Sequence, residues 1–149
     1  MAAVTFKAVS HKGKGGLIVE SQTHGFKIVM DEPENLGGTN QGMNPLEGLL
    51  VSFGSCLVIV GAAFAKAQGI DLQDLWIETE GNLDTDGFLR GIEGARPGFQ
   101  DVHFTIHIKS NSPEAKLHEF QKFMESRCPV TDTLRNGTRI NANTLVIER

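Results

Sequence analysis

Cysteine is scarce in this chain. Only Cys56 and Cys128 occur among the 149 residues, and they do not form a Cys-x-x-Cys pair. A chain of this length buries a sufficient core without disulfide bonds, so neither cysteine is needed as scaffold. The lack of a paired spacing also removes the usual signature of a zinc site. Two interpretations of the thiols stay open: a two-thiol redox site, or two ordinary buried cysteines.

Long basic runs are missing as well. The formal net charge is −4, and the most basic stretch is Lys12-Gly13-Lys14. Such a chain has no general attraction to nucleic acid or to anionic membranes, so we expect neither as a partner. The N-terminus has no apolar segment with a small-residue cleavage site. We therefore expect a cytoplasmic protein whose thiols lie in a reducing environment.

The histidines and glycines show no ligand spacing. His103 and His107 fall on one face of a predicted strand, where about 3.3 Å per residue separates them by roughly 13 Å. The glycine-rich segments lack the spacing of a nucleotide-binding loop, and no Gly-x-Ser-x-Gly elbow occurs. We therefore expect no metal and no cofactor, and the sequence disfavours a serine hydrolase.

What the sequence does contain is an uncharged run of 18 residues, from Gly48 to Ala65, that includes Cys56. A run of this length is at the lower limit for a membrane span. The glycines and serines inside it and a mean hydropathy of −0.15 for the chain argue against a membrane helix. A helix that is apolar on every side is otherwise buried on every side, and one chain of this size has little material to cover it. We therefore expect a partner subunit.

Local signals mark the start of this helix. Asn44 is a suitable N-cap, Pro45 suits the first helical position, and Glu47 can complete a capping box. The helix is predicted to run from Pro45 to about Gln68, with Gly69 as its C-terminal stop.

Alternation of apolar and polar residues predicts the strands. They fall at residues 4–9, 16–20, 26–30, 75–80, 102–109 and 141–148. Residues 31–43 are rich in turn formers and predict a long loop, while residues 81–98 predict a glycine-rich link that is part hairpin.

Two further helices are predicted after the strand at residues 102–109. One begins at residues 112–114 and has an apolar stripe at Leu117, Phe120, Phe123 and Met124. A short helix follows, from Pro129 to about Asn136. Runs of strands followed by helices, with no interdomain linker, predict a single α+β domain over residues 1–149.

The local settings of the two cysteines differ. Cys128 directly precedes Pro129, where a helix N-terminus would direct N–H groups at its sulfur, and Arg127 is adjacent; both features favour the thiolate. The alternative is a small N-capping residue with no redox role. Cys56 lies mid-helix among apolar neighbours, which raises the pKa of a thiol unless a cation is brought to it.

Five segments carry a family resemblance. They are Asn44-Pro45-Leu46-Glu47, Gly54-Ser55-Cys56, Gly87-Phe88-Leu89, Ala95-Arg96-Pro97-Gly98-Phe99-Gln100 and Cys128-Pro129-Val130. In order and spacing they resemble the OsmC/Ohr family of thiol-dependent peroxide-handling proteins, over most of the chain. The resemblance implies an intertwined homodimer in which antiparallel sheets wrap around two long central helices that carry the reactive cysteines.

The resemblance also implies a role for each thiol. Cys56 is the peroxidatic thiol that becomes a sulfenic acid, Cys128 resolves it to a disulfide, and a dithiol of the lipoyl or another type reduces the pair. A sulfenic acid condenses readily with a nearby thiol, so the scheme is chemically sound. The implied function is the reduction of organic hydroperoxides. The alternative is a non-peroxidatic member that binds a small hydrophobic molecule in the dimer cleft.

The chain departs from the family pattern at the helix start. The hydroperoxidase branch has a glutamate ten residues before the cysteine, where this chain has Leu46; Glu47 is nine residues before it. A shift of one residue turns the side chain by about 100° around the helix. Glu47 is therefore a candidate catalytic residue and also a candidate cap.

The second departure concerns the cation that holds the thiolate. The family brings an arginine from its N-terminal strands, but this chain has no arginine before Arg90. The candidates are Lys14, Arg96 and Arg127, and the sequence does not choose among them. A lysine lacks the planar fork with which an arginine pairs two groups at once.

Overall fold

The structure is a computed structural model that describes residues 3–141 and 144–149. The chain divides into two compact units, Met1–Val51 and Ser52–Arg149. Helix α1 (Pro45–Phe64) begins in the first unit and continues into the second.

The first unit is built on a three-stranded antiparallel sheet in the order β1 (Val9–Lys12), β2 (Val19–Thr23), β3 (Phe26–Met30). His24 and Gly25, both with positive φ, form the two-residue turn between β2 and β3. The strand predicted at residues 26–30 is confirmed. The one predicted at residues 4–9 begins only at Val9, because β2 ends at Thr23 and no strand of the described residues lies opposite the earlier ones.

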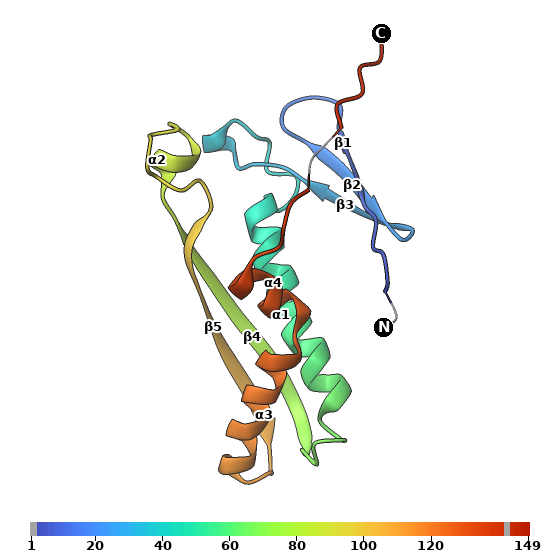
Figure 1. Cartoon of the computed structure of the whole chain (residues 1–149), viewed down its shortest axis with the longest axis vertical. Helices are drawn as coiled ribbons and strands as arrows, with labels where there is room; N and C mark the ends of the chain where they lie inside the picture. The colour runs from blue at the N-terminus through green and yellow to red at the C-terminus, as the bar shows by residue number, and fades with distance from the viewer. Residues whose placement is uncertain (1–2, 142–143) are drawn as a thin grey trace. The chain divides into compact units, whose positions relative to one another are not determined.

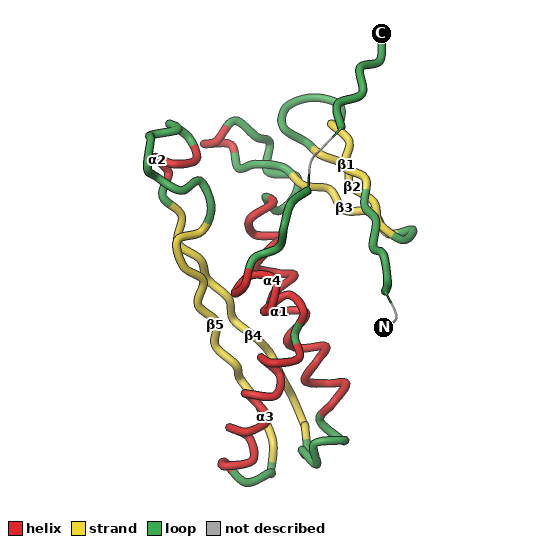
Figure 2. Tube along the Cα trace, in the orientation of Figure 1, coloured by secondary structure: helices red, strands yellow, loops and turns green. Residues whose placement is uncertain are grey.

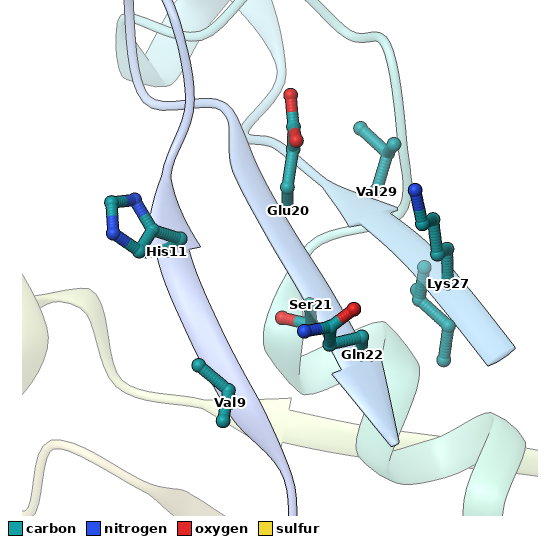
Figure 3. A pocket seen from close by; sticks show the side chains of 8 residues that line it. Val9, His11, Glu20, Ser21, Gln22, Lys27 and Val29 are labelled. Carbon is teal, nitrogen blue, oxygen red and sulfur yellow. The ribbon is translucent and has the colours of Figure 1, made fainter. Parts of the chain in front are cut away.

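One face of this sheet carries a hollow of about 220 Å³ (Figure 3). Cross-strand neighbours line it in two rows, Val9 with Gln22 and Lys27, and His11 with Glu20 and Val29. Val9 and Val29 remain 58% and 44% exposed, so this face presents apolar as well as polar groups.

The loop between β3 and α1 is organised by a buried carboxylate. As predicted, residues 31–43 form a loop, which includes the short helix η1 (Glu34–Leu36). Asp31 is 2% exposed and accepts hydrogen bonds from the Thr39 hydroxyl and from the N–H groups of Glu32, Thr39 and Gln41. The Thr39 hydroxyl is the main cause that lowers the pKa of Asp31 to about 2, with the N–H groups adding to it against the effect of burial.

The second unit pairs two long strands. β4 (Leu72–Leu83) and β5 (Phe99–Ser110) form an antiparallel hairpin, and its connection holds the short helix α2 (Thr85–Phe88). Helices α3 (Glu114–Arg127) and α4 (Pro129–Asn136) follow (Figure 1). The predictions for both helices are confirmed, and both strands extend beyond their predicted bounds.

The core lies between one face of this hairpin and the helices. Its buried members are Phe53, Leu57, Val60, Ala65, Ile70, Phe120, Met124 and Cys128. The rings of Phe53 and Phe104 meet edge to face with centroids 5.2 Å apart, which joins α1 to β5. A Cβ at Gly61 would collide with the side chains of Leu75 and Met124, so glycine permits the close approach of α1 to β4.

The C-terminal end of helix α1 and the C-terminal segment of the chain differ from the predictions. Helix α1 ends at Phe64 rather than near Gln68, and the next residues form turns that lead to Gly69 with a φ of +65°. The strand predicted at residues 141–148 is wrong for the described residues 141 and 144–148, which have no regular structure (Figure 2). A strand needs a neighbour for its backbone N–H and C=O groups, and no described residue pairs with this segment.

The predicted fold class is confirmed, since antiparallel sheets combine with helices in an α+β arrangement. The assignment of residues 1–149 to one domain stays a prediction.

Replacing Asp31 with Asn should lower the melting temperature at about pH 7 by a few degrees, because the amide loses the charge that three N–H groups and a hydroxyl bind. The folded pKa of about 2 lies below the ordinary 3.8, so this stabilisation is present above pH 3.8 and is lost as the pH falls towards 2. The difference in melting temperature should therefore shrink between about pH 7 and about pH 3 when followed by circular dichroism.

The matched control is Glu34→Gln, which changes an exposed carboxylate in the same loop and should leave the melting temperature nearly unchanged. An Asp31→Asn effect of the same size at both pH values would contradict the electrostatic account.

Candidate active site

The two cysteines meet in the core of the second unit. Cys56 comes from the middle of α1, and Cys128 from the junction between α3 and α4. Both are free thiols, and they are close enough to hydrogen-bond to each other. The fold thus unites Cys56 and Cys128, as the family resemblance implied although their spacing in the sequence did not.

The N-terminus of α4 holds the Cys128 sulfur. Cys128 has an extended backbone and acts as the N-cap, and Pro129 occupies the first turn, as predicted. The backbone N–H of Thr131 donates to Cys128 Sγ at 3.3 Å. The Cys128 N–H donates to the carbonyl of Met124 at 3.1 Å, which ties the residue to the end of α3. Cys128 is therefore fixed from both sides.

Burial and the neighbouring thiol act on Cys56 in the same direction. Burial is the largest cause that raises the pKa of the Cys56 thiol, and the hydrogen bond with Cys128 raises it further. The Val130 N–H at the start of α4 opposes both effects. In this arrangement Cys56 is largely protonated at neutral pH.

The net effect on the pKa of Cys128 has the opposite sign. Burial is the largest single effect and opposes the thiolate, but Cys56, the hydroxyl and N–H of Thr131 and the Val130 N–H together lower the pKa of Cys128. The directions agree with those predicted for the two thiols from their local settings. The N-terminus of α4 thus supplies donors to both sulfurs.

Exposure separates the two thiols in another way. Cys56 is half-buried, whereas Cys128 is 1% exposed. In the single chain, solvent therefore has more access to Cys56 than to Cys128.

The three candidate cations lie in different parts of the chain. The guanidinium of Arg127 lies over the ring of Phe123, 5.6 Å from its centroid. Arg96 is exposed in the connection between β4 and β5, and Lys14 is exposed in the turn between β1 and β2 of the first unit. Within residues 3–141 and 144–149, burial, Cys128 and Val130 account for the pKa of Cys56, and none of these is a cation. The activation of Cys56 by one of the three stays a prediction.

Glu47 forms the predicted capping box. Its carboxylate accepts the Asn44 N–H at 2.8 Å, and its own N–H donates to Asn44 Oδ1 at 2.8 Å. Glu47 is exposed, and this reciprocal pair explains its presence at the start of α1.

The sequence did not predict a role for two residues of the site, Val130 and Thr131. The Thr131 N–H donates to Cys128 Sγ, and the Val130 N–H and the Thr131 hydroxyl favour the thiolates. Their signal is positional, since both lie in the first turn of the helix that Pro129 announces.

The histidines weighed as metal ligands have other partners. His107 Nε2 lies 2.8 Å from a carboxylate oxygen of Glu78, and its ring stacks on Trp76 with centroids 4.6 Å apart. His103 Nε2 lies 3.3 Å from Asp101.

Comparison with known proteins identifies the same family along most of the chain. The model of the OsmC family, described as OsmC-like protein, matches residues 38–143. A protein of Mycoplasma pneumoniae named hydroperoxide reductase is 26% identical over 122 residues, which cover 79% of each chain. A hydroperoxide reductase of Mycoplasma genitalium is 28% identical over 129 residues, which cover 84% of each chain.

The fold has a close counterpart among solved structures. The crystal structure of an OsmC-like protein from Mycoplasma pneumoniae superposes with a TM-score of 0.78 and 21% identity, and covers 99% of this chain and 100% of that one. At this identity the likeness concerns the fold alone.

Replacing Glu47 with Gln should cost about 1 kcal/mol of unfolding free energy or less, because glutamine also serves in a capping box. The reactivity of the Cys56 thiol should stay the same. Denaturant unfolding measures the first quantity, and the rate of thiol loss with peroxide measures the second. Asn44→Ala, which removes the other half of the box, should cost about 1 kcal/mol and also leave the thiol rate unchanged. A large loss of rate in Glu47→Gln at unchanged stability would instead make the carboxylate catalytic.

Proposed function

Because this chain belongs to the OsmC-like family, we propose that it is a thiol-dependent peroxidase that reduces organic hydroperoxides. The observation that supports this most is the meeting of Cys56 and Cys128, two free thiols within hydrogen-bonding reach. Two relatives named hydroperoxide reductase support the peroxide-related chemistry.

The reaction begins at Cys56. Its thiolate attacks the peroxide, the O–O bond breaks, and the sulfur is oxidised to sulfenic acid while the peroxide leaves as an alcohol after protonation. The Cys128 thiolate then attacks the Cys56 sulfur. An S–S bond forms as the S–O bond breaks, and the released hydroxide takes up a proton to become water.

The order of the two thiols follows from access. The half-buried Cys56 meets an incoming peroxide, while Cys128 is 1% exposed and suits a step inside the site. The lowered pKa of Cys128 fits the resolver as well, since the resolving step also needs a thiolate.

Cys56 needs a cation to become a thiolate, and a second subunit is the proposed source. The candidates remain Lys14, Arg96 and Arg127. A partner that covers the site would bring its own copies of these residues. This accounts for the raised pKa of Cys56 in the single chain.

Helix α1 supports a homodimer. It is long and apolar enough to cross a membrane by length and composition, and 28% of its most apolar 18-residue stretch is buried within the chain. Its side chains Val51, Ile59 and Phe64 are 53%, 66% and 41% exposed. Such a surface needs cover, and a second copy supplies it in the proposed soluble, cytoplasmic dimer.

A dithiol of the lipoyl type or another thiol closes the cycle. It attacks the Cys56–Cys128 disulfide through a mixed disulfide and leaves as its own disulfide, so both cysteines return to thiols. In a reducing cytoplasm the protein disulfide is transient.

The two cysteine variants should behave differently. Cys56→Ser should abolish peroxide turnover. Cys128→Ser should permit one oxidation and leave Cys56 as a sulfenic acid that dimedone traps and excess peroxide over-oxidises. Mass spectrometry after one equivalent of peroxide identifies the modified residue. A dimedone adduct on Cys128 in Cys56→Ser, with none on Cys56 in Cys128→Ser, would reverse the assigned order.

The raised pKa of Cys56 favours one rival function, a non-peroxidatic protein whose apolar dimer cleft binds a small hydrophobic molecule. The enzyme loses two thiols per chain quickly at stoichiometric peroxide, whereas the binding protein keeps them.

Sedimentation should find an obligate dimer at micromolar concentration, because an interface that covers α1 resembles a core cut in half. Ile59→Glu should place a charge in that interface and yield monomers or aggregates. Ile92→Glu, at an exposed isoleucine between β4 and β5, is the control and should stay dimeric. A stable, folded monomer of the unchanged chain would defeat the prediction.

A further inference from the structure

Thr131 has a buried hydroxyl with unusual surroundings. The residue is 4% exposed, and among the described residues its Oγ1 is the buried side-chain polar atom without a hydrogen bond of regular geometry. A buried hydroxyl without a partner costs free energy that an isosteric valine avoids. A structural role alone therefore does not explain a threonine here.

The hydroxyl belongs to the residue whose backbone binds the sulfur of Cys128. It favours the Cys128 thiolate, although in the reduced pair it has no hydrogen bond. The N–H of the same residue donates to Cys128 Sγ at 3.3 Å. From α1, the titratable group that faces Cys128 is Cys56.

We infer that Thr131 is a positioning residue of the resolving step, in which its N–H and hydroxyl hold the Cys128 sulfur as a thiolate directed at Cys56. The inference rests on the proposed peroxidase cycle. When the thiolate attacks the Cys56 sulfenic acid, its lone pair becomes the S–S bond, the S–O bond breaks and the hydroxide leaves as water. The hydroxyl of Thr131 is then released from an anionic partner, so it stabilises the state before the attack and not the disulfide.

The test uses the Cys56→Ser background, in which Cys128 is the sole cysteine. Absorbance at about 240 nm against pH reports its thiolate fraction directly, without peroxide. At a pH below the midpoint of the titration, adding Thr131→Val should reduce the fraction of thiolate about three- to tenfold, because a hydrogen bond to a charged group is lost. Thr131→Ser should restore it.

Thr133→Val is the matched control on the same helix. The Thr133 hydroxyl donates to the Pro129 carbonyl at 2.8 Å, so its loss should leave the Cys128 titration unchanged. The melting temperature of Thr131→Val should be equal to or above that of its parent, because an unsatisfied hydroxyl is replaced by a methyl group of the same shape. A merely structural role would lower the melting temperature and leave the titration in place.

In the two-cysteine chain, Thr131→Val should slow disulfide formation after a single peroxide equivalent about three- to tenfold. A titration of Thr131→Val that superimposes on its parent overturns the inference; if this variant does not fold, Thr131→Ala is titrated by the same criterion. Because the titration needs no peroxide, it decides the role of Thr131 even where the proposed peroxidase activity fails.

Discussion

Helix α1 imposes the constraint on which the rest of this protein depends, because it is apolar around most of its circumference and one chain covers only part of it. The hairpin of β4 and β5, with α3 and α4, buries the side that carries Phe53, Leu57 and Val60. That packing fixes the depth of Cys56 and brings it to Cys128. The other side, with Val51 and Ile59, leaves apolar side chains exposed, which favours a second copy that covers them.

The electrostatics of the site are those of a helix N-terminus inside an apolar core. Burial disfavours both thiolates, and the first turn of α4 counteracts it with the N–H groups of Val130 and Thr131. The donors suffice to lower the pKa of Cys128 but not that of Cys56. In the proposed cycle, the more acidic Cys128 is suited to resolve a sulfenic acid, and Cys56 needs a cation from outside the single chain for the first attack.

Specific residues explain how far the sequence could predict the fold. Pro45 with the Asn44–Glu47 box marked the start of α1, and Pro129 marked α4, because caps and prolines act on backbone groups within one turn. The strand expected near Leu145 failed for the opposite reason. A strand forms only where another backbone lies alongside it, and no local pattern contains that information.

The sequence by itself determined the α+β class, the helix starts and, through five short segments, the family, all of which depend on residues close together in the chain or on their order. Only the tertiary structure decided how Cys56 and Cys128 meet, that the Thr131 N–H donates to the Cys128 sulfur, and that the guanidinium of Arg127 lies on the Phe123 ring. The physical reason is that the pKa of a thiol is set by groups within a few ångströms in space, and the chain brings such groups together from α1, α3 and α4 only when it packs.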